Sequence, residues 1–185
     1  MLSQWARELY TWSSAIVIGI VVALFVSIFL FQPTKVSGHS MEPTLHHQNR
    51  IYISKIPRTF SYNPKYGDIV IIDSRVHRDR SFKDDLVDNP FYRLVFGHEE
   101  NTVWVKRVIG KPGDTIEIRD NQVFRNEQKV NEPYIKEKMT NTPNQTIQVP
   151  DNQIFVMGDN RNYSQDSRVI GTIPIDHVLG IKLFD

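Results

Sequence analysis

The sequence predicts a mostly β protein, in which a coiled antiparallel-sheet domain follows one N-terminal transmembrane helix. Three observations lead to this prediction. A long uncharged segment lies near the N-terminus, apolar residues alternate with polar ones along much of the remainder, and turn-forming residues separate these alternating segments. No long segment with the helical period of 3.6 follows the first one, which disfavours a parallel α/β sheet.

The N-terminal segment has the length and composition of a membrane span. Residues 9–34 carry no charge, and residues 13–31 are almost wholly apolar. A helix over those 19 positions is ~28 Å long, about the thickness of the hydrocarbon core of a bilayer. Aromatic residues typical of the membrane interface precede it, at Trp5, Tyr10 and Trp12. We expect Pro33 to end the helix, because proline continues a helix poorly.

Two other structures share such a segment, a cleaved secretory signal and a buried core helix. The apolar part of a signal is usually about 7–15 residues long and ends at a site of small residues. Residues 36–38 (Val-Ser-Gly) match that site weakly, so a permanent span is favoured. The flanking charges, Arg7 and Lys35, are too nearly balanced to give the orientation.

Six later segments alternate apolar and polar residues or form short runs rich in β-branched residues, as strands do. They are residues 49–56, 68–73, 102–109, 114–119, 122–125 and 153–157. Turn signals lie between them, for example at residues 111–114 and 158–160. We therefore expect two parts, a tail and anchor over residues 1–34 and a β domain over 35–185. Irregular insertions are expected near 76–100 and 126–150.

Composition excludes several classes of function. The chain has 22 Lys and Arg against 21 Asp and Glu, so no basic field supports nucleic acid binding. It has no cysteine, which excludes a disulfide scaffold, thiol catalysis and cysteine-ligated zinc. The neighbours His46 and His47 point to opposite faces of an extended segment, so they do not form a metal site.

Ser40 is the first candidate for chemistry. It lies within residues 37–45 (SGHSMEPTL), just past the span, where Gly38 and Pro43 favour an exposed bend. A serine needs a base to become a nucleophile, and His39 would point away from it in an extended segment. Taken by itself, Ser40 is more often a turn serine than a nucleophile.

Lys106 is the candidate base. Strand alternation places it on one face with Trp104 and Val108. If that face is buried, desolvation of the ammonium lowers the lysine pKa, and a lysine with a pKa of ~7–8 can act as a general base. If the face is solvated, Lys106 simply extends its charge into water.

A third cluster, residues 158–168 (GDNRNYSQDSR), is dense in hydrogen-bonding groups. Asp166 and Arg168 can form an ion pair, and Ser164 can offer its hydroxyl to a lysine amine. The alternative is a polar loop held by local hydrogen bonds between side chains and backbone.

The order of these motifs resembles that of the bacterial type I signal peptidases. The motifs are residues 37–45, 67–70 (GDIV), 105–114 (VKRVIGKPGD) and 158–168, and the resemblance runs from the span to the C-terminus. The single span and short domain are similar to the smaller members in Gram-positive bacteria and cyanobacteria. The resemblance implies a mostly β, coiled-sheet domain with a membrane-associated apolar surface.

The resemblance also implies roles for individual residues. Ser40 matches the nucleophile of the family, Lys106 its general base, and Ser164 a hydroxyl that hydrogen-bonds the lysine. The supporting residues are Arg107, Asp159 and the ion pair of Asp166 with Arg168. Candidate walls of the substrate pockets are Val36, Met41, Trp104 and Val105.

The implied activity is that of a membrane-bound serine endopeptidase with a serine–lysine dyad. It removes signal peptides from exported preproteins, cuts after small residues at positions −1 and −3, and requires no metal or organic cofactor. Expected partners are signal peptides and the lipid bilayer, with the secretion translocon nearby. The N-terminus is expected in the cytoplasm and the catalytic domain outside it, at the cell membrane or, in a cyanobacterium, the thylakoid membrane.

Two positions depart from the family pattern. Gly38 stands where some members carry a serine that donates to the oxyanion, so the backbone N–H of Ser40 is the expected donor and the second donor is unassigned. Asn162 stands where many members carry Asp.

Two other functions are open to such a chain: a self-cleaving regulator that uses the same dyad, and a membrane-tethered binding domain without catalysis.

Overall fold

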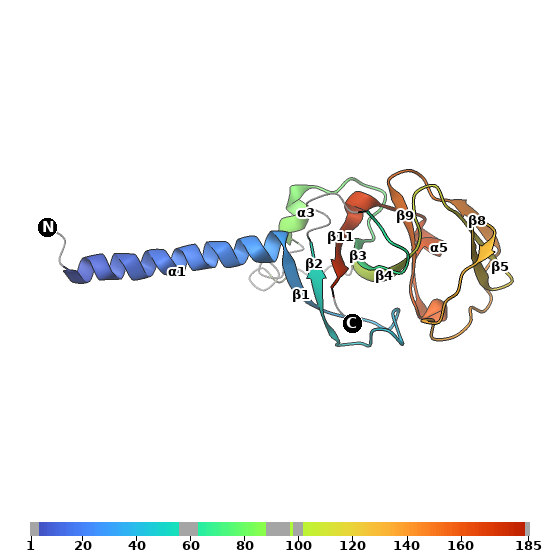
Figure 1. The fold of residues 1–185 in the computed structure, drawn as a ribbon, viewed down its shortest axis with the longest axis horizontal. Coiled ribbons are helices and arrows are strands. Elements are labelled where there is room, and N and C mark those ends of the chain that lie inside the picture. The colour runs from blue at the N-terminus through green and yellow to red at the C-terminus, as the bar shows by residue number, and fades with distance from the viewer. Residues whose placement is uncertain (1–3, 56–62, 88–96, 98–101, 184–185) are drawn as a thin grey trace.

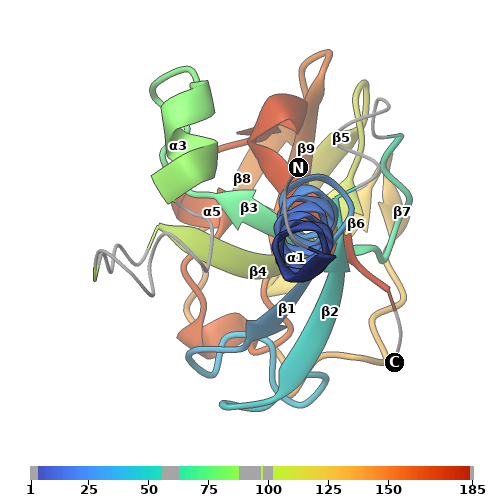
Figure 2. The same cartoon turned by 90° about the vertical axis from the view of Figure 1, so that its left-hand side faces the viewer.

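The computed structural model describes residues 4–55, 63–87, 97 and 102–183. One long helix, α1 (Gln4–Phe29), projects from a β domain (Figure 1), and a view along the helix shows it standing in front of the sheets (Figure 2). The β domain is mostly antiparallel, with a curled half-barrel sheet. This architecture confirms the fold predicted from the sequence.

α1 is long and apolar enough to cross a membrane, and none of its apolar window is buried inside the protein. Exposed along it are Trp5, Leu9, Tyr10, Trp12, Ile16, Val17, Ile18, Ile20, Val21, Val22 and Phe25. A helix with apolar side chains on all sides needs an apolar solvent, which lipid provides.

The end of α1 corrects one expectation. The helix ends at Phe29, four residues before Pro33, so the proline is not what stops it. Pro33 instead lies in strand β1 (Phe31–Lys35), which forms the outer edge of the sheet. An edge strand accommodates proline because one side of its backbone has no partner strand.

The larger sheet has seven strands, and every pairing in it is antiparallel. In spatial order they are β1, β2 (Arg50–Ser54), β11 (Val178–Lys182), β3 (Ile69–Asp73), β4 (Val103–Gly110), β9 (Gln153–Met157) and β10 (Ile173–Pro174). Four of the predicted strands are found here, as β2, β3, β4 and β9. The sequence pattern did not predict β1, β10 and β11, although β11 is an interior strand between β2 and β3.

The smaller sheet has four strands: β7 (Gln128–Lys129), β6 (Gln122–Arg125), β5 (Thr115–Arg119) and β8 (Gln145–Gln148). The predicted strands over 114–119 and 122–125 are β5 and β6. The segment 126–150, expected to be an irregular insertion, supplies β7 and β8. Of the segment 76–100, the structure shows α3 (Phe82–Val87), while residues 88–96 and 98–100 lie outside the described residues.

Three short helices complete the described elements: η1 (Arg161–Tyr163), α5 (Ser167–Ile170) and η2 (Ile175–His177). Both η1 and α5 lie in the loop that follows β9. They fold the polar cluster 158–168 into a compact connection back to β10.

The central strands are buried on both faces because an apolar cluster packs against each face. Ile69 and Ile71 of β3 join one apolar cluster, and the alternate residues Val70 and Ile72 join a second. A third cluster lies between β9 and the smaller sheet, where Phe155 packs with residues that include Ile116, Ile118, Val123 and Val149. A polar side chain on the inner strands is therefore taken out of water.

Candidate active site

Ser40 and Lys106 meet at the centre of the candidate site. The Lys106 Nζ donates a hydrogen bond to Ser40 Oγ over 2.9 Å. Lys106 lies on β4 opposite Val70 of β3, and its side chain is only 3% exposed. Ser40 lies in the turn that follows β1 and is half-buried. The structure thus brings together the two residues that the sequence proposed as nucleophile and base.

The surroundings of Lys106 favour its neutral form. Burial lowers the pKa of Lys106 from its ordinary 10.5 to about 8, because the ammonium loses its water. The negative charges of Asp166 and Asp159 oppose this change, and the positive charge of Arg168 adds to it. The ring of Trp104 lies 5.4 Å from Lys106 Nζ, on the same side of the strand. The face of β4 that carries Lys106 is therefore buried and not solvated.

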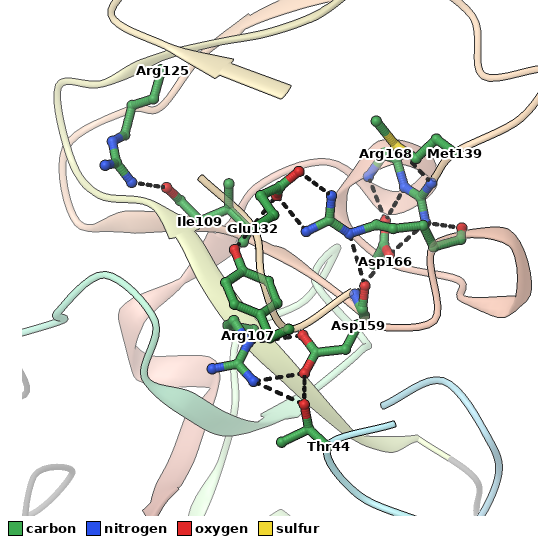
Figure 3. A network of polar contacts seen from close by, with 12 residues as sticks. Thr44, Arg107, Ile109, Arg125, Glu132, Met139, Asp159, Asp166 and Arg168 are labelled. Carbon is green, nitrogen blue, oxygen red and sulfur yellow. Dashed lines mark hydrogen bonds and ion pairs between the residues drawn. The ribbon is translucent and has the colours of Figure 1, made fainter. Parts of the chain in front are cut away.

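Arg107, the next residue on β4, points to a different set of groups. Its guanidinium forms two hydrogen bonds with the buried carboxylate of Asp159, over 2.8 and 2.6 Å, and a third with the carbonyl of Gly67. Thr44 Oγ1 donates to the same carboxylate (Figure 3). Asp159 therefore ties the turn of Ser40, strand β4 and the loop after β9 to one another.

Asp166 and Arg168 form the ion pair expected from the sequence. The Arg168 guanidinium donates one hydrogen bond to each carboxylate oxygen of Asp166, over 2.8 and 2.9 Å (Figure 3). Asp166 also accepts from the backbone N–H of Gly158, so it anchors the start and the end of the loop. These donors hold the pKa of the Asp166 carboxyl below its ordinary value despite a burial that acts the other way.

Ser164 differs from the expectation. Its Oγ donates to Asp166 Oδ2 over 2.8 Å, and within the described part of the chain it forms no hydrogen bond with Lys106. The physical reason is the nearby carboxylate, since a charged acceptor binds a hydroxyl more strongly than a neutral amine does. Ser164 therefore holds Asp166, whose negative charge acts on the candidate base Lys106.

Gly158 is where the loop approaches the nucleophile. A Cβ at this position would stand 2.5 Å from the backbone oxygen of Ser40, and it would also collide with the side chain of Ser164. No side chain larger than hydrogen fits there without movement of the backbone.

Comparison with known proteins identifies the family of the chain. A family described as signal peptidase, peptidase S26, matches residues 9–184 of the chain. The chain belongs to the signal peptidase family S26. It is a membrane-anchored serine peptidase of the signal peptidase I type, and it cleaves signal peptides. This membership sets aside both the self-cleaving regulator and the non-catalytic binding domain.

The similarity extends over nearly the whole peptidase. Signal peptidase I of Bacillus licheniformis is 38% identical over 189 residues, covering 96% of this chain and 88% of the relative. Signal peptidase I P of Bacillus subtilis subsp. natto is 36% identical, covering 94% and 86%. The probable signal peptidase I-1 of Synechocystis is 34% identical, covering 91% and 78%.

The four candidate pocket residues of the peptidase are not equally open. Val36 and Met41 are buried in the first apolar cluster, while Val105 packs against that cluster and is half-buried. Trp104 is also half-buried and packs against the second cluster. Trp104 therefore lies on the Lys106 face of β4, whereas Val105 lies on the opposite face with the cluster that contains Val36 and Met41.

Several contacts around the site could not be foreseen from the sequence. Asn160 donates to the turn of Ser40, and Lys136 pairs with Glu42 over 2.7 Å. A hydrogen bond from Lys136 and one from His39 lower the pKa of Glu42 to about 2. In the part of the chain that the structure describes, no group of three His, Asp or Glu residues is placed to hold a metal ion. The contacts of Asn160 and Lys136 join residues far apart in the chain, and no sequence pattern predicts contacts of that kind.

Proposed function

We propose that the peptidase uses Ser40 as nucleophile and Lys106 as general base, with no metal or organic cofactor. The observation that carries the proposal is the 2.9 Å hydrogen bond between Lys106 Nζ and Ser40 Oγ. A nucleophile and its base must lie within hydrogen-bond reach, and this pair does. A pKa of about 8 leaves a useful fraction of Lys106 neutral near neutral pH.

Neutral Lys106 takes the proton of Ser40 as the Oγ attacks the carbonyl carbon of the scissile peptide. The carbonyl oxygen becomes negatively charged, and the N–H of Ser40 is its proposed donor. The C–N bond then breaks, and the Lys106 ammonium gives its proton to the leaving amine. A water that loses a proton to Lys106 attacks the acyl carbon, the ester C–O bond to Ser40 breaks, and the Lys106 ammonium returns the proton to Ser40 Oγ.

Five further residues support this chemistry by holding the site in place. They are Arg107, Asp159, Asp166, Arg168 and Ser164. Their hydrogen bonds connect the turn of Ser40 to β4 and to the loop after β9. None of them is proposed to contact the reacting atoms.

We assign to the substrate an extended conformation and small residues at −1 and −3. Alternate side chains of an extended peptide point to the same side, so two shallow pockets read two positions. Val36, Met41, Trp104 and Val105 are the proposed walls of these pockets; Trp104 and Val105 are half-buried, whereas Val36 and Met41 are buried. We also propose that residues 1–34 anchor the chain and residues 35–185 form the catalytic domain, with the cut near the membrane surface, outside the cytoplasm and near the translocon.

The test is cleavage of a preprotein by the detergent-solubilised full chain, beside Ser40→Ala, with the products sized by mass spectrometry. We expect a cut after a small-x-small triplet that is absent with Ser40→Ala. A cut that persists with Ser40→Ala would overturn the assignment of the nucleophile. A cut after large residues would overturn the specificity.

A further inference from the structure

Asn160 makes two hydrogen bonds to the turn that holds the nucleophile. Its backbone N–H donates to the carbonyl of Ser40 over 3.0 Å. Its side-chain Nδ2 donates to the carbonyl of His39 over 3.1 Å. The residue stands between Asp159 and η1 and is 2% exposed. One residue on the loop after β9 therefore holds two successive carbonyls, that of Ser40 through its backbone N–H and that of His39 through its side chain.

The carbonyl of His39 and the N–H of Ser40 belong to the same peptide unit. That unit is planar, and in the trans form its C=O and N–H point in opposite directions. A donor that fixes the His39 oxygen therefore fixes the direction of the Ser40 N–H as well. This N–H is the oxyanion donor of the proposed function, on which the present inference rests.

The Ser40 N–H itself has no acceptor within the described residues. The His39 carbonyl, by contrast, receives two donors, Asn160 Nδ2 and the N–H of Glu42 at 3.2 Å. Donors on the carbonyl of a peptide polarise its N–H and strengthen the bond that it can give. The His39–Ser40 peptide unit is thus fixed by the donors to the His39 oxygen, and the Ser40 N–H remains available to bind an oxyanion.

The Oδ1 atom of the Asn160 amide also supports a functional role for this residue. Its Oδ1 is buried and has no hydrogen-bond partner within the described residues. A buried acceptor without a donor costs stability, and such groups in native proteins call for an explanation. Here the amide must turn Nδ2 toward the His39 oxygen, which leaves Oδ1 without a partner.

We propose that Asn160 is a positioning residue of the oxyanion hole. By holding the His39–Ser40 peptide unit, it directs the Ser40 N–H toward the oxygen of the tetrahedral intermediate. It touches neither Lys106 nor Ser40 Oγ within the described contacts, so its effect falls on the stability of the oxyanion and not on proton transfer.

The experiment compares Asn160→Ala with Asn162→Ala in the solubilised full chain. Asn162 is the same residue type two positions later, and its amide bonds Thr140, Glu137 and Lys138 instead. We expect Asn160→Ala to lower kcat roughly 10- to 100-fold, less than the ~10²–10³-fold loss seen when an oxyanion donor itself is removed. KM should change less than about twofold, because the oxyanion exists only in the transition state. The pH profile should stay where it is.

Stability provides a second readout. Asn160→Ala removes one hydrogen bond and also the unpartnered Oδ1, so its unfolding midpoint should lie close to that of the unaltered chain. Asn160→Asp keeps the shape and places an oxygen opposite the His39 carbonyl, so it should lose kcat as well. This second variant serves if Asn160→Ala does not fold.

A kcat for folded Asn160 variants equal to that of Asn162→Ala would overturn the inference. A raised KM with unchanged kcat, or a displaced pH profile, would also overturn it, because Asn160 would then act on substrate or on Lys106. Ser40→Ala in the same assay separates the two proposals. If Ser40→Ala is inactive and Asn160→Ala is normal, only the role of Asn160 fails. If Ser40→Ala stays active, the proposed function fails first.

Discussion

Lys106 Nζ lies 2.9 Å from Ser40 Oγ, although 66 positions separate the two residues in the chain. The contact depends on two features of the fold. Pairing of β3 with β4 sets Lys106 opposite Val70 and buries its amine. The close approach of Gly158 and Asn160 to the Ser40 carbonyl then holds the turn over that amine.

Lys106→Met should leave a folded protein with little activity. Methionine keeps the apolar length of the side chain but removes the base, which contributes roughly 10²–10⁴-fold to such reactions. The unfolding midpoint at neutral pH should stay equal or rise, because the desolvated ammonium is gone. Preprotein cleavage and thermal unfolding check this. Lys129→Met, an exposed lysine on β7, is the control and should cleave normally. Normal cleavage by Lys106→Met would contradict the dyad.

Activity should rise with pH through about 8. The folded pKa of Lys106 is about 8, below the ordinary 10.5, and the neutral amine is the active form. The rate kcat/KM should therefore fall about tenfold per pH unit below 8 and level off above it. The unfolded chain holds this proton more tightly, so the same group makes stability rise between about pH 8 and pH 10.5. A rate that stays flat from about pH 6 to about pH 10 would contradict a lowered lysine pKa.

Asp159→Ala should destabilise the protein strongly. The carboxylate is fully buried against the guanidinium of Arg107, and its removal takes away two charge-assisted hydrogen bonds of that guanidinium. Breaking a buried pair in this way costs about 3–5 kcal/mol, measurable by urea unfolding. Asp151→Ala, at an exposed position, should change the free energy of unfolding by no more than about 0.5 kcal/mol. Equal effects of the two substitutions would show that the pair contributes nothing.

Gly158→Ala should lower activity by about 10²-fold or more. The new Cβ would stand 2.5 Å from the Ser40 backbone oxygen, so the turn must move. A displacement of about 1 Å at a reacting group costs about that factor. Gly19→Ala in α1, where the added Cβ meets nothing within 4 Å, is the matched control. Unchanged cleavage with Gly158→Ala would mean that the site tolerates a different position of Ser40.

A chain truncated to residues 30–185 should be more stable than one truncated to 36–185. β1 pairs with β2 over five positions, from Phe31 opposite Ser54 to Lys35 opposite Arg50. Removing β1 deletes that ladder, and a loss of ~2–3 kcal/mol would lower the unfolding midpoint by roughly 5–10 °C. Equal midpoints would show that β1 adds no stability to the β domain, in agreement with a domain boundary near residue 35 as the sequence predicts.

Several features were predictable from the sequence because they depend on near neighbours. An uncharged apolar segment long enough for a bilayer identifies a span whatever follows it. Alternation of apolar and polar residues located β2, β4, β5, β6 and β9, since side chains of a strand point alternately to its two faces. A short run rich in β-branched residues located β3, which is buried throughout. The spacing of residues 37–45, 105–114 and 158–168 carried the resemblance to the signal peptidases, now established for the chain.

Other strands gave no local signal. β11 contains Gly180, which ordinarily weakens a strand, yet a Cβ there would stand 2.5 Å from the backbone oxygen of Ser54. The glycine is needed because two strands approach closely, and only the folded sheet reveals that approach. β8 has the sequence Gln-Thr-Ile-Gln, which is too short and too polar to alternate visibly.

The sequence by itself determined the membrane span, the β class, most of the central strands and the family to which the chain belongs. The tertiary structure alone decided that Lys106 is buried, that Ser164 donates to Asp166, and that Asn160 holds the turn of Ser40. The physical reason is the range of the interactions. Backbone geometry and hydropathy act over a few residues and leave a periodic trace, whereas hydrogen bonds and desolvation join residues that only the packed sheets bring together.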